Sequence, residues 1–261
     1  MTLALVADVI DASYVDGPGN RYVVFLQGCT FRCVTCHNPH TIATCPTVGA
    51  RWIDVADLHA EIAARAPFLS GVTVSGGEAT LQWGAVHELF RRLAADPATS
   101  GLTRLVDSNG DAAPEVWDVL ASSMDGAMVD LKALDPDVHR ALTGHGNDRV
   151  LASIRQLHGL GQLTEVRLLV VPGENDTPEQ VAATGRWLAE LDPPPPIVVQ
   201  GFRRAGTRGV AHHLPEATLA GLDEVAAGLV AAGLPESAVH VRGAAALATG
   251  VPVTVTVSDP A

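Results

Sequence analysis

The sequence lacks the features that mark membrane, secreted or nucleic-acid-binding proteins. Its longest apolar runs are short and interrupted, so none is long enough to span a bilayer. Its net charge is −12, and nucleic-acid-binding proteins normally present a basic face to the phosphate backbone. Residues 1–8 contain no basic segment, so we expect a strand there and not a signal peptide. We therefore expect a cytoplasmic protein with no membrane and no nucleic-acid partner.

Lysine is almost absent. Lys132 is the single lysine among 17 lysine and arginine residues. A site that needs a compact point charge instead of a planar guanidinium would keep a lysine. Chance is the alternative, because the two residues often replace one another on surfaces. The position of Lys132 directly after an expected strand favours a functional role.

Cysteine is also scarce, but three of the four cysteines, Cys29, Cys33 and Cys36, fall within eight residues. Thiolates at such spacing select zinc or an iron–sulfur cluster, and free thiols suit the cytoplasm. Three thiolates are one short of a closed four-ligand site, and an open position is where a metal centre does chemistry. Two closed sites remain as alternatives: an electron-transfer cluster that adds Cys45, or a zinc site that adds His37.

The composition, with 47% hydrophobic and 18% charged residues, is that of a packed globular protein. The length suits one large α/β domain, and no change of composition suggests a second. We expect a single domain over residues 1–261, with a core at about 7–243 and a tail at about 244–261. The run at residues 251–258 alternates like a strand, but an edge strand, a dimer contact and a disordered tail all remain open.

Segments typical of strands and helices alternate along the chain. Parallel strands joined by helices form right-handed β/α units, and six such units make a partial (β/α)6 barrel. The expected strands are 22–26, 71–75, 103–106, 127–131, 166–171 and 197–200, with a last strand at 239–241. The expected helices are 55–65, 84–94, 114–122, 136–142, 149–157, 178–191 and 215–232.

Polar motifs follow directly after several of these strands. They are the cysteine segment, Gly76-Gly77-Glu78, Asp107-Ser108-Asn109-Gly110 and Lys132. In barrels of this kind the active site lies at the carboxyl ends of the strands. The sequence therefore predicts that these motifs meet in one site.

An ordered set of motifs between residues 7 and 201 resembles the glycyl-radical-enzyme activases of the radical S-adenosylmethionine (SAM) superfamily. The motifs are Asp16-Gly-Pro-Gly, Gln27-Gly-Cys, Cys36-His-Asn-Pro, Ser75-Gly-Gly-Glu-Ala-Thr-Leu-Gln, Asp107-Ser-Asn-Gly, Met128-Val-Asp-Leu-Lys, Leu142-Thr-Gly and Arg167-Leu-Leu-Val-Val-Pro. As an ordered set they are specific to that family, whose fold is the partial barrel expected above.

This resemblance implies two cofactors. The three thiolates would hold three irons of a [4Fe–4S] cluster, and SAM would chelate the fourth iron through its amino and carboxylate groups. An electron from the reduced cluster then breaks a C–S bond of SAM, and the resulting 5′-deoxyadenosyl radical abstracts a hydrogen atom from the substrate. No catalytic side chain is expected beyond the cluster and SAM.

The resemblance also implies which residues bind these groups. The backbone of the Gly-Gly-Glu segment and Lys132 would hold the methionyl end of SAM, while the segment after the third cysteine would lie against the adenine. The expected cofactor-binding residues are His37, Asn38, Gly76, Gly77, Glu78, Asp107, Asp130, Lys132 and Arg167, and the cluster ligands are Cys29, Cys33 and Cys36. A monovalent cation, Na⁺ or K⁺, would be held by Asp107, Ser108, Met128 through its carbonyl, and Asp130.

Two of these assignments have plain structural alternatives. Gly76 and Gly77 would let the backbone approach a ligand closely, but a Gly-Gly pair is also an ordinary tight turn. Asp107 and Asp130 could bind the ribose hydroxyls, the SAM ammonium or a cation, or could simply accept hydrogen bonds from nearby amides.

The chain departs from the family at several places, including Thr35, where the family often has an aromatic residue before the third cysteine. After Cys45 it enters the first helix through residues 46–51 with no further cysteine, so it lacks the ferredoxin-like insertion of a similar subgroup and the ligands for auxiliary clusters. After the sixth strand, a loop carries Arg203, Arg204 and Arg208. These arginines could meet a partner or an anionic substrate, or could simply be solvated.

The sequence thus predicts a radical SAM oxidoreductase that forms the glycyl radical of a partner enzyme, with flavodoxin or ferredoxin as electron donor. The first alternative is a radical SAM enzyme that modifies a small molecule or peptide in biosynthesis. The second is a closed iron–sulfur or zinc module for binding or electron transfer. The partner, the oligomeric state and the role of Cys45 stay open.

Overall fold

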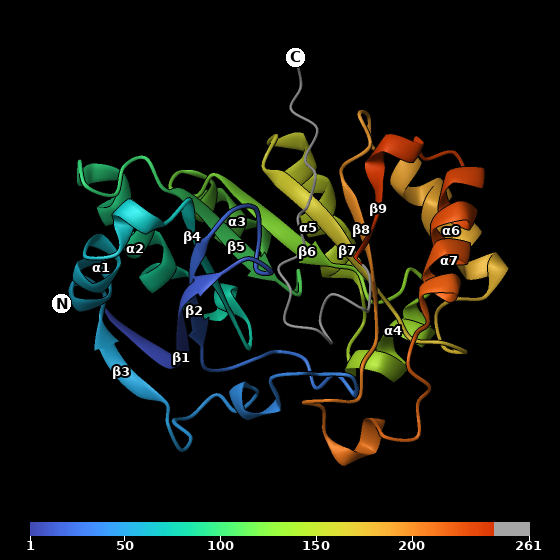
Figure 1. Ribbon diagram of the computed structural model, residues 1–261, viewed down its shortest axis with the longest axis horizontal. Helices are drawn as coiled ribbons and strands as arrows, with labels where there is room; N and C mark the ends of the chain where they lie inside the picture. Colours follow the sequence, from blue (N-terminus) through green and yellow to red (C-terminus); the bar gives the residue numbers. More distant parts are fainter. Residues whose placement is uncertain (243–261) are drawn as a thin grey trace.

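The computed structural model describes residues 1–242, which contain nine strands. They are β1 (Leu3–Ser13), β2 (Arg21–Leu26), β3 (Arg51–Asp54), β4 (Gly71–Gly76), β5 (Thr103–Ser108), β6 (Gly126–Asp130), β7 (Leu163–Val170), β8 (Ile197–Gly201) and β9 (Val239–Arg242). All nine belong to one sheet, in the order β3-β1-β2-β4-β5-β6-β7-β8-β9 (Figure 1). The expected tail, including the alternating run 251–258, lies outside the described residues, and a single domain over the whole chain stays a prediction.

Seven neighbouring strands, β2 and β4 to β9, run parallel to one another, which confirms the expected α/β class. β1 pairs antiparallel with β2, and β3 antiparallel with β1. The sequence did not predict β3, because this short edge strand has no buried face to create an alternating pattern. Within residues 1–242 the sheet ends at β3 on one side and β9 on the other, so the barrel is partial and open.

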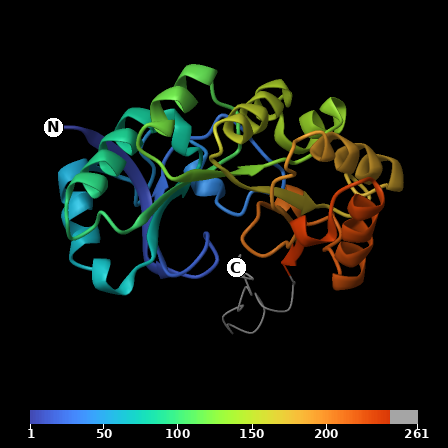
Figure 2. The same cartoon turned by 90° about the horizontal axis from the view of Figure 1, so that it is seen from above.

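Helices cover the outer side of the curved sheet, as Figure 2 shows. They are α1 (Val55–Ala63), α2 (Trp83–Ala95), α3 (Pro114–Ala121), α4 (Pro136–Thr143), α5 (Asp148–Gly159), α6 (Pro178–Ala189) and α7 (Leu219–Ala231). In the part of the chain that the structure describes, no helix combines the length and the apolar character needed to cross a membrane.

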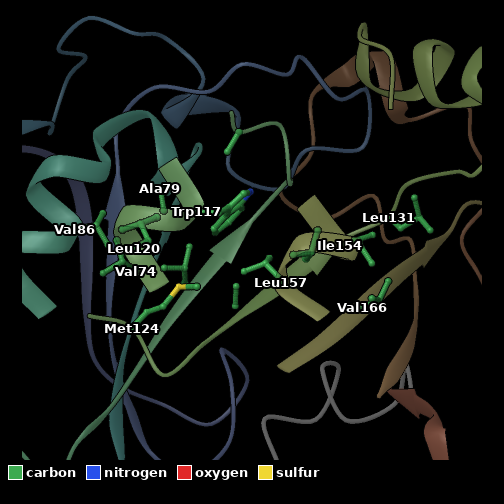
Figure 3. Packing of buried hydrophobic residues seen from close by; sticks show 14 of the residues in the cluster. Val74, Ala79, Val86, Trp117, Leu120, Met124, Leu131, Ile154, Leu157 and Val166 are labelled. Atoms are coloured by element: carbon green, nitrogen blue, oxygen red, sulfur yellow. The ribbon is translucent and has the colours of Figure 1, made fainter. Parts of the chain in front are cut away.

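The main core lies between these helices and the sheet (Figure 3). Trp117 and Leu120 on α3 and Ile154 on α5 are fully buried, as are Val74 and Val166 on the strands. The Trp117 indole N–H donates to the hydroxyl of Ser153 at 2.7 Å, so its single polar atom is paired inside the core.

The last helix starts later than its proline suggests. It was expected from Pro215, but α7 begins at Leu219 because Thr218 is the N-cap and its hydroxyl accepts the Gly221 N–H at 3.1 Å. Before it, the Ala217 N–H donates to the Phe202 carbonyl at 3.2 Å. Residues 215–217 therefore belong to the loop that follows β8.

The side chain of Arg21 is fully buried and lies against the sheet near the amino ends of the strands. Its guanidinium donates to the hydroxyls of Thr73 at 2.6 Å and Thr103 at 2.9 Å and to the Val72 carbonyl at 2.7 Å. Burial lowers the pKa of Arg21 to about 10, against the raising effect of Asp125. Because these hydrogen bonds occupy the guanidinium, Arg21 serves the structure at the end of the barrel opposite the polar motifs.

Candidate active site

A cavity of about 730 Å³ opens at the carboxyl ends of the strands. This volume lies in the range of small-molecule sites. Most of the sequence-predicted residues line it: Cys29, Cys33, Cys36, His37, Asn38, Gly76, Gly77, Asp107, Ser108, Asp130 and Lys132. Three expected residues, Glu78, Met128 and Arg167, are buried and are not among its lining residues. The cavity brings together motifs that lie about a hundred residues apart in the sequence.

The cysteine loop, residues 27–38, leaves β2 and is held by the end of α4. The N–H groups of Arg32 and Val34 donate to the carbonyls of Thr143 and Leu142, both at 2.9 Å. The helix ends at Gly144, which has a positive φ of 82° that favours glycine. The Leu142-Thr-Gly motif is therefore the support of the cysteine loop.

The three thiols of this loop are free and half-buried, and all face the cavity, whereas Cys45 is exposed and does not line it. Burial raises the pKa of Cys29 to about 12 and that of Cys33 to about 11, and it also raises the pKa of Cys36. These thiols are thus neutral at pH 7 until a metal centre binds them as thiolates and releases their protons.

Asn109 reaches the cysteine loop from the end of β5. Its side-chain NH₂ lies 3.6 Å from the sulfur of Cys29 and 3.2 Å from the hydroxyl of Thr30. The distance to sulfur suits a weak N–H···S hydrogen bond. The site therefore contains a polar donor aimed at one of the expected cluster ligands.

Gly76 and Gly77 are required first by the chain itself. A Cβ on Gly76 would lie 2.2 Å from the backbone nitrogen of Leu26, and one on Gly77 would lie 2.2 Å from the carbonyl of Gly28. Gly76 also has a φ of 120°, which side chains rarely adopt. The glycines let β4 lie directly against the start of the cysteine loop, while their backbone borders the cavity. The two glycines thus serve the packing of the chain, and their backbone is also placed where it could contact a ligand.

Glu78 ties the end of β4 to the end of β5. One carboxylate oxygen accepts hydrogen bonds from Thr80, through its N–H at 2.9 Å and its hydroxyl at 2.6 Å, and from the Ser108 hydroxyl at 2.8 Å. The other accepts the Asn109 N–H at 2.7 Å. Burial raises the pKa of Glu78 against the lowering effect of these bonds. Protein groups therefore occupy this carboxylate, and the Glu78 backbone N–H also donates to the Gly28 carbonyl at 2.7 Å, so a contact between Glu78 and SAM stays a prediction.

Two partly buried ion pairs lie at the ends of β5 and β6. The Lys132 ammonium contacts the Asp130 carboxylate at 2.8 Å, and the Arg167 guanidinium contacts Asp107 at 2.8 Å. Although burial raises the pKa of Asp130, Lys132 holds it below its usual value. Burial raises the pKa of Asp107 despite Arg167. Both aspartates therefore form ion pairs, and neither only accepts hydrogen bonds from nearby amides, which was the structural alternative.

The residues expected around a cation share the ends of β5 and β6, where Asp107 and Met128 are paired neighbours. Their polar groups already have partners. Besides Arg167, Asp107 accepts the Ser75 hydroxyl at 2.7 Å, and the Ser108 hydroxyl donates to Glu78 and accepts the Gly110 N–H at 2.9 Å. A cation bound here would have to exchange some of these contacts, and the cation site stays a prediction.

The segment that follows β8, residues 202–217, folds back onto the cysteine loop. Arg208 donates to the carbonyls of Arg32 at 3.0 Å and Cys33 at 2.8 Å, and the imidazole Nε2 of His37 lies 3.0 Å from the Arg203 carbonyl. Arg203 lines the cavity beside Glu216, whereas Arg204 bonds to the Leu214 carbonyl within its own segment. The three arginines therefore have different roles, and Arg208 is more than a solvated side chain.

Several cavity residues carried no assignment in the sequence analysis: Phe31, Thr35, Ser75, Asn109, Leu169, Gln200, Gly201, Ala205, Glu216 and Arg242. Ser75 and Asn109 lie inside recognised motifs, and Gln200 and Arg242 end strands, so the strand-end rule could have found them. Nothing local in the sequence marks Glu216, which reaches the cavity through the fold of its loop.

A family model described as the radical SAM superfamily matches residues 23–185. A pyruvate formate-lyase-activating enzyme of Streptococcus mutans is 37% identical to this chain over 183 residues, covering 68% of this chain and 69% of that protein. Its counterpart in Staphylococcus aureus is 31% identical over 217 residues, covering 77% and 84%. The chain belongs to the radical SAM superfamily.

The fold of this radical SAM protein agrees with that of a solved relative. A radical SAM methyltransferase from Sphaerobacter thermophilus has a TM-score of 0.67 at 18% identity, covering 88% of this chain and 69% of that one. The superfamily uses a [4Fe–4S] cluster and SAM. The donor set fits these groups, because three free thiols, Lys132 and the backbone of Gly76 and Gly77 border one cavity.

The closed alternatives fit this radical SAM protein less well. Among residues 1–242, no three His, Cys, Asp or Glu side chains gather closely enough to hold a single metal ion. His37 is already bonded to the Arg203 carbonyl, and Cys45 is exposed outside the cavity. Because neither candidate fourth ligand lies free beside the three thiols, they leave one position of a cluster open.

Proposed function

We propose that this radical SAM enzyme activates a glycyl radical enzyme by removing a hydrogen atom from a glycine α-carbon in a loop of that partner. The observation that carries the proposal is the likeness to activating enzymes, at 37% identity over 183 residues of a pyruvate formate-lyase-activating enzyme. The open cavity at the strand ends supports it, because a loop of another protein needs direct access to the cofactors.

In this proposal the cofactors supply the radical chemistry, and the chain binds and orients them. Cys29, Cys33 and Cys36 hold the cluster. Lys132 meets the carboxylate of SAM, since its ammonium lies in the cavity wall and is kept charged by Asp130. The backbone of Gly76 and Gly77 receives the SAM ammonium, and the segment at His37 and Asn38 lies against the adenine.

The finer assignments belong to the same proposal. Flavodoxin or ferredoxin would supply the electron in the cytoplasm. A monovalent cation at Asp107, Ser108, Met128 and Asp130 would add positive charge near the SAM carboxylate. If it does, the affinity for SAM will depend on the K⁺ or Na⁺ concentration; an affinity independent of both ions would remove the cation from the proposal.

The first experiment is anaerobic and tests the chemistry and the partner separately. The cluster is reconstituted and reduced, SAM is added, and 5′-deoxyadenosine and methionine are quantified while the EPR spectrum is recorded. We then add candidate partner proteins that carry a glycyl-radical motif, and look for a protein-based glycyl radical signal. SAM cleavage with that signal is the expected result.

Two outcomes would contradict the proposal at different levels. SAM cleavage without a glycyl radical on any candidate partner would favour a small-molecule or peptide substrate. A fully loaded cluster with an EPR signal indifferent to SAM would contradict the radical SAM activity itself.

A further inference from the structure

The sulfur of Cys29 has different neighbours from the sulfurs of Cys33 and Cys36. It accepts hydrogen bonds from the Phe31 backbone N–H at 3.4 Å and from the Asn109 side-chain NH₂ at 3.6 Å. Within residues 1–242, Cys29 is the only one of the three that accepts a hydrogen bond from a side chain. The cysteine site is therefore electrostatically asymmetric.

The orientation of the Asn109 amide is fixed by its other contacts. Its side-chain oxygen accepts the Asp111 N–H at 2.8 Å, and its backbone N–H donates to the buried Glu78 carboxylate at 2.7 Å. Flipping the amide would place the NH₂ group against the Asp111 N–H and leave no donor toward Cys29 or Thr30. The hydrogen bonds of Asn109 with Asp111 and with the buried Glu78 thus hold the NH₂ group toward the sulfur.

We propose that Asn109 is a positioning residue that sets the reduction potential of the cluster through its hydrogen bond to the Cys29 sulfur. The proposal rests on the assignment of Cys29 as a cluster ligand. Reduction adds one electron, taken from a low-potential donor protein, and places more negative charge on the cluster and its sulfurs; no bond to Asn109 forms or breaks. An N–H donor stabilises that charge more in the reduced state than in the oxidised state, so it raises the midpoint potential.

The chain offers variants that separate this effect from loop support. Asn109→Ala removes the donor. Asn109→Ser also removes it, because the side chain is too short to reach the sulfur, but its hydroxyl can still accept the Asp111 N–H and keep the turn. Thr30→Val is the matched control, since it removes the other contact of the Asn109 NH₂ group, at 3.2 Å, and leaves the N–H···S bond in place.

The test is a potentiometric EPR titration of the reconstituted proteins without SAM, each normalised to its iron content. We expect the midpoint potential to shift in the negative direction in Asn109→Ala and Asn109→Ser, and to stay at the wild-type value in Thr30→Val. Iron and sulfide contents near wild type in Asn109→Ser would show that the shift is electrostatic and not a loss of cluster.

Two results would overturn the inference. One is a wild-type midpoint potential in loaded Asn109→Ser. The other is an equal shift in Thr30→Val, which would mean that Asn109 acts only by supporting the loop. Neither result depends on SAM cleavage or on a partner protein, so the inference can fail while the proposed function stands, and the reverse also holds.

Discussion

The single lysine of the chain lies in the wall of the cavity. Lys132 is partly buried beside Asp130, and this carboxylate raises its pKa against the lowering effect of burial. The ammonium is therefore charged at pH 7. A charged, compact donor in the cavity wall is what a carboxylate ligand requires.

Replacing this lysine by arginine should weaken SAM binding although the charge is kept. The larger planar guanidinium cannot occupy the same space and keep both the Asp130 contact and the ligand contact. We expect Lys132→Arg to bind SAM at least about tenfold more weakly, the equivalent of one hydrogen bond to a charged group. Calorimetry of the cluster-loaded protein measures this, with Arg91→Lys, on an exposed residue of α2, as the control. Equal affinity in Lys132→Arg and wild type would refute this role.

Glu78 belongs to a motif that predicts ligand binding, but its carboxylate has a structural function. Its buried carboxylate accepts four hydrogen bonds from Thr80, Ser108 and Asn109. Glu78→Ala leaves these donors unpaired in the interior, so we expect the free energy of unfolding to fall by about 3 kcal/mol or more. Urea unfolding under anaerobic conditions measures the change. Glu115→Ala, at an exposed position of α3, should change it by less than about 0.5 kcal/mol, and a similarly small effect at Glu78 would contradict the assignment.

At the scale of elements, the cysteine loop is held from two sides. The end of α4 supports it through backbone hydrogen bonds, and the segment 202–217 adds the side chain of Arg208. The loop itself contains no regular strand or α-helix. Its shape therefore depends on elements that follow it by more than a hundred residues.

Removing Arg208 should loosen the cysteine loop. Arg208→Ala loses both hydrogen bonds to the loop carbonyls, so we expect faster amide hydrogen exchange across residues 29–38 and weaker retention of iron. Arg204→Ala is a matched control in the same segment, because the hydrogen bonds of Arg204 within residues 1–242 go to groups of that segment. Exchange rates in the loop that match those of wild type would show that Arg208 does not support it.

The elements differ in how far the sequence could predict them. The buried parallel strands and the motifs at their ends were predictable because hydrophobic period and turn residues are local signals. The four-residue edge strand β3 gave no such signal. The contacts of Asn109 with Cys29 and of Arg208 with Cys33 join residues 80 and 175 positions apart, so no local pattern could predict them. For the same reason the sequence predicted ligand binding for Gly76 and Glu78. In the structure the missing Cβ of Gly76 also lets β4 pack closely against β2, and the Glu78 carboxylate also binds the end of β5.

On the scale of the whole molecule, the two ends of the parallel strands have opposite characters. The amino ends are filled by Arg21 and its partners on β4 and β5. The carboxyl ends carry the cavity, the thiols and the charged side chains. This division separates stability from function, as in other barrels of parallel strands.

A ligand that occupies the cavity should therefore protect one end of the molecule only. When SAM is added to the cluster-loaded protein, we expect slower amide hydrogen exchange at residues 28–38, 76–80, 107–110 and 130–132, and unchanged exchange at 18–21, 70–71 and 103–104. A hundredfold excess of SAM over its Kd should also raise the free energy of unfolding by about 2.7 kcal/mol. A variant with Cys29→Ala, Cys33→Ala and Cys36→Ala lacks the cluster that anchors SAM and should show neither effect. Protection at the amino ends would place SAM outside this cavity, and equal protection in the triple variant would mean that the three cysteines do not anchor SAM; either result would contradict the proposed site.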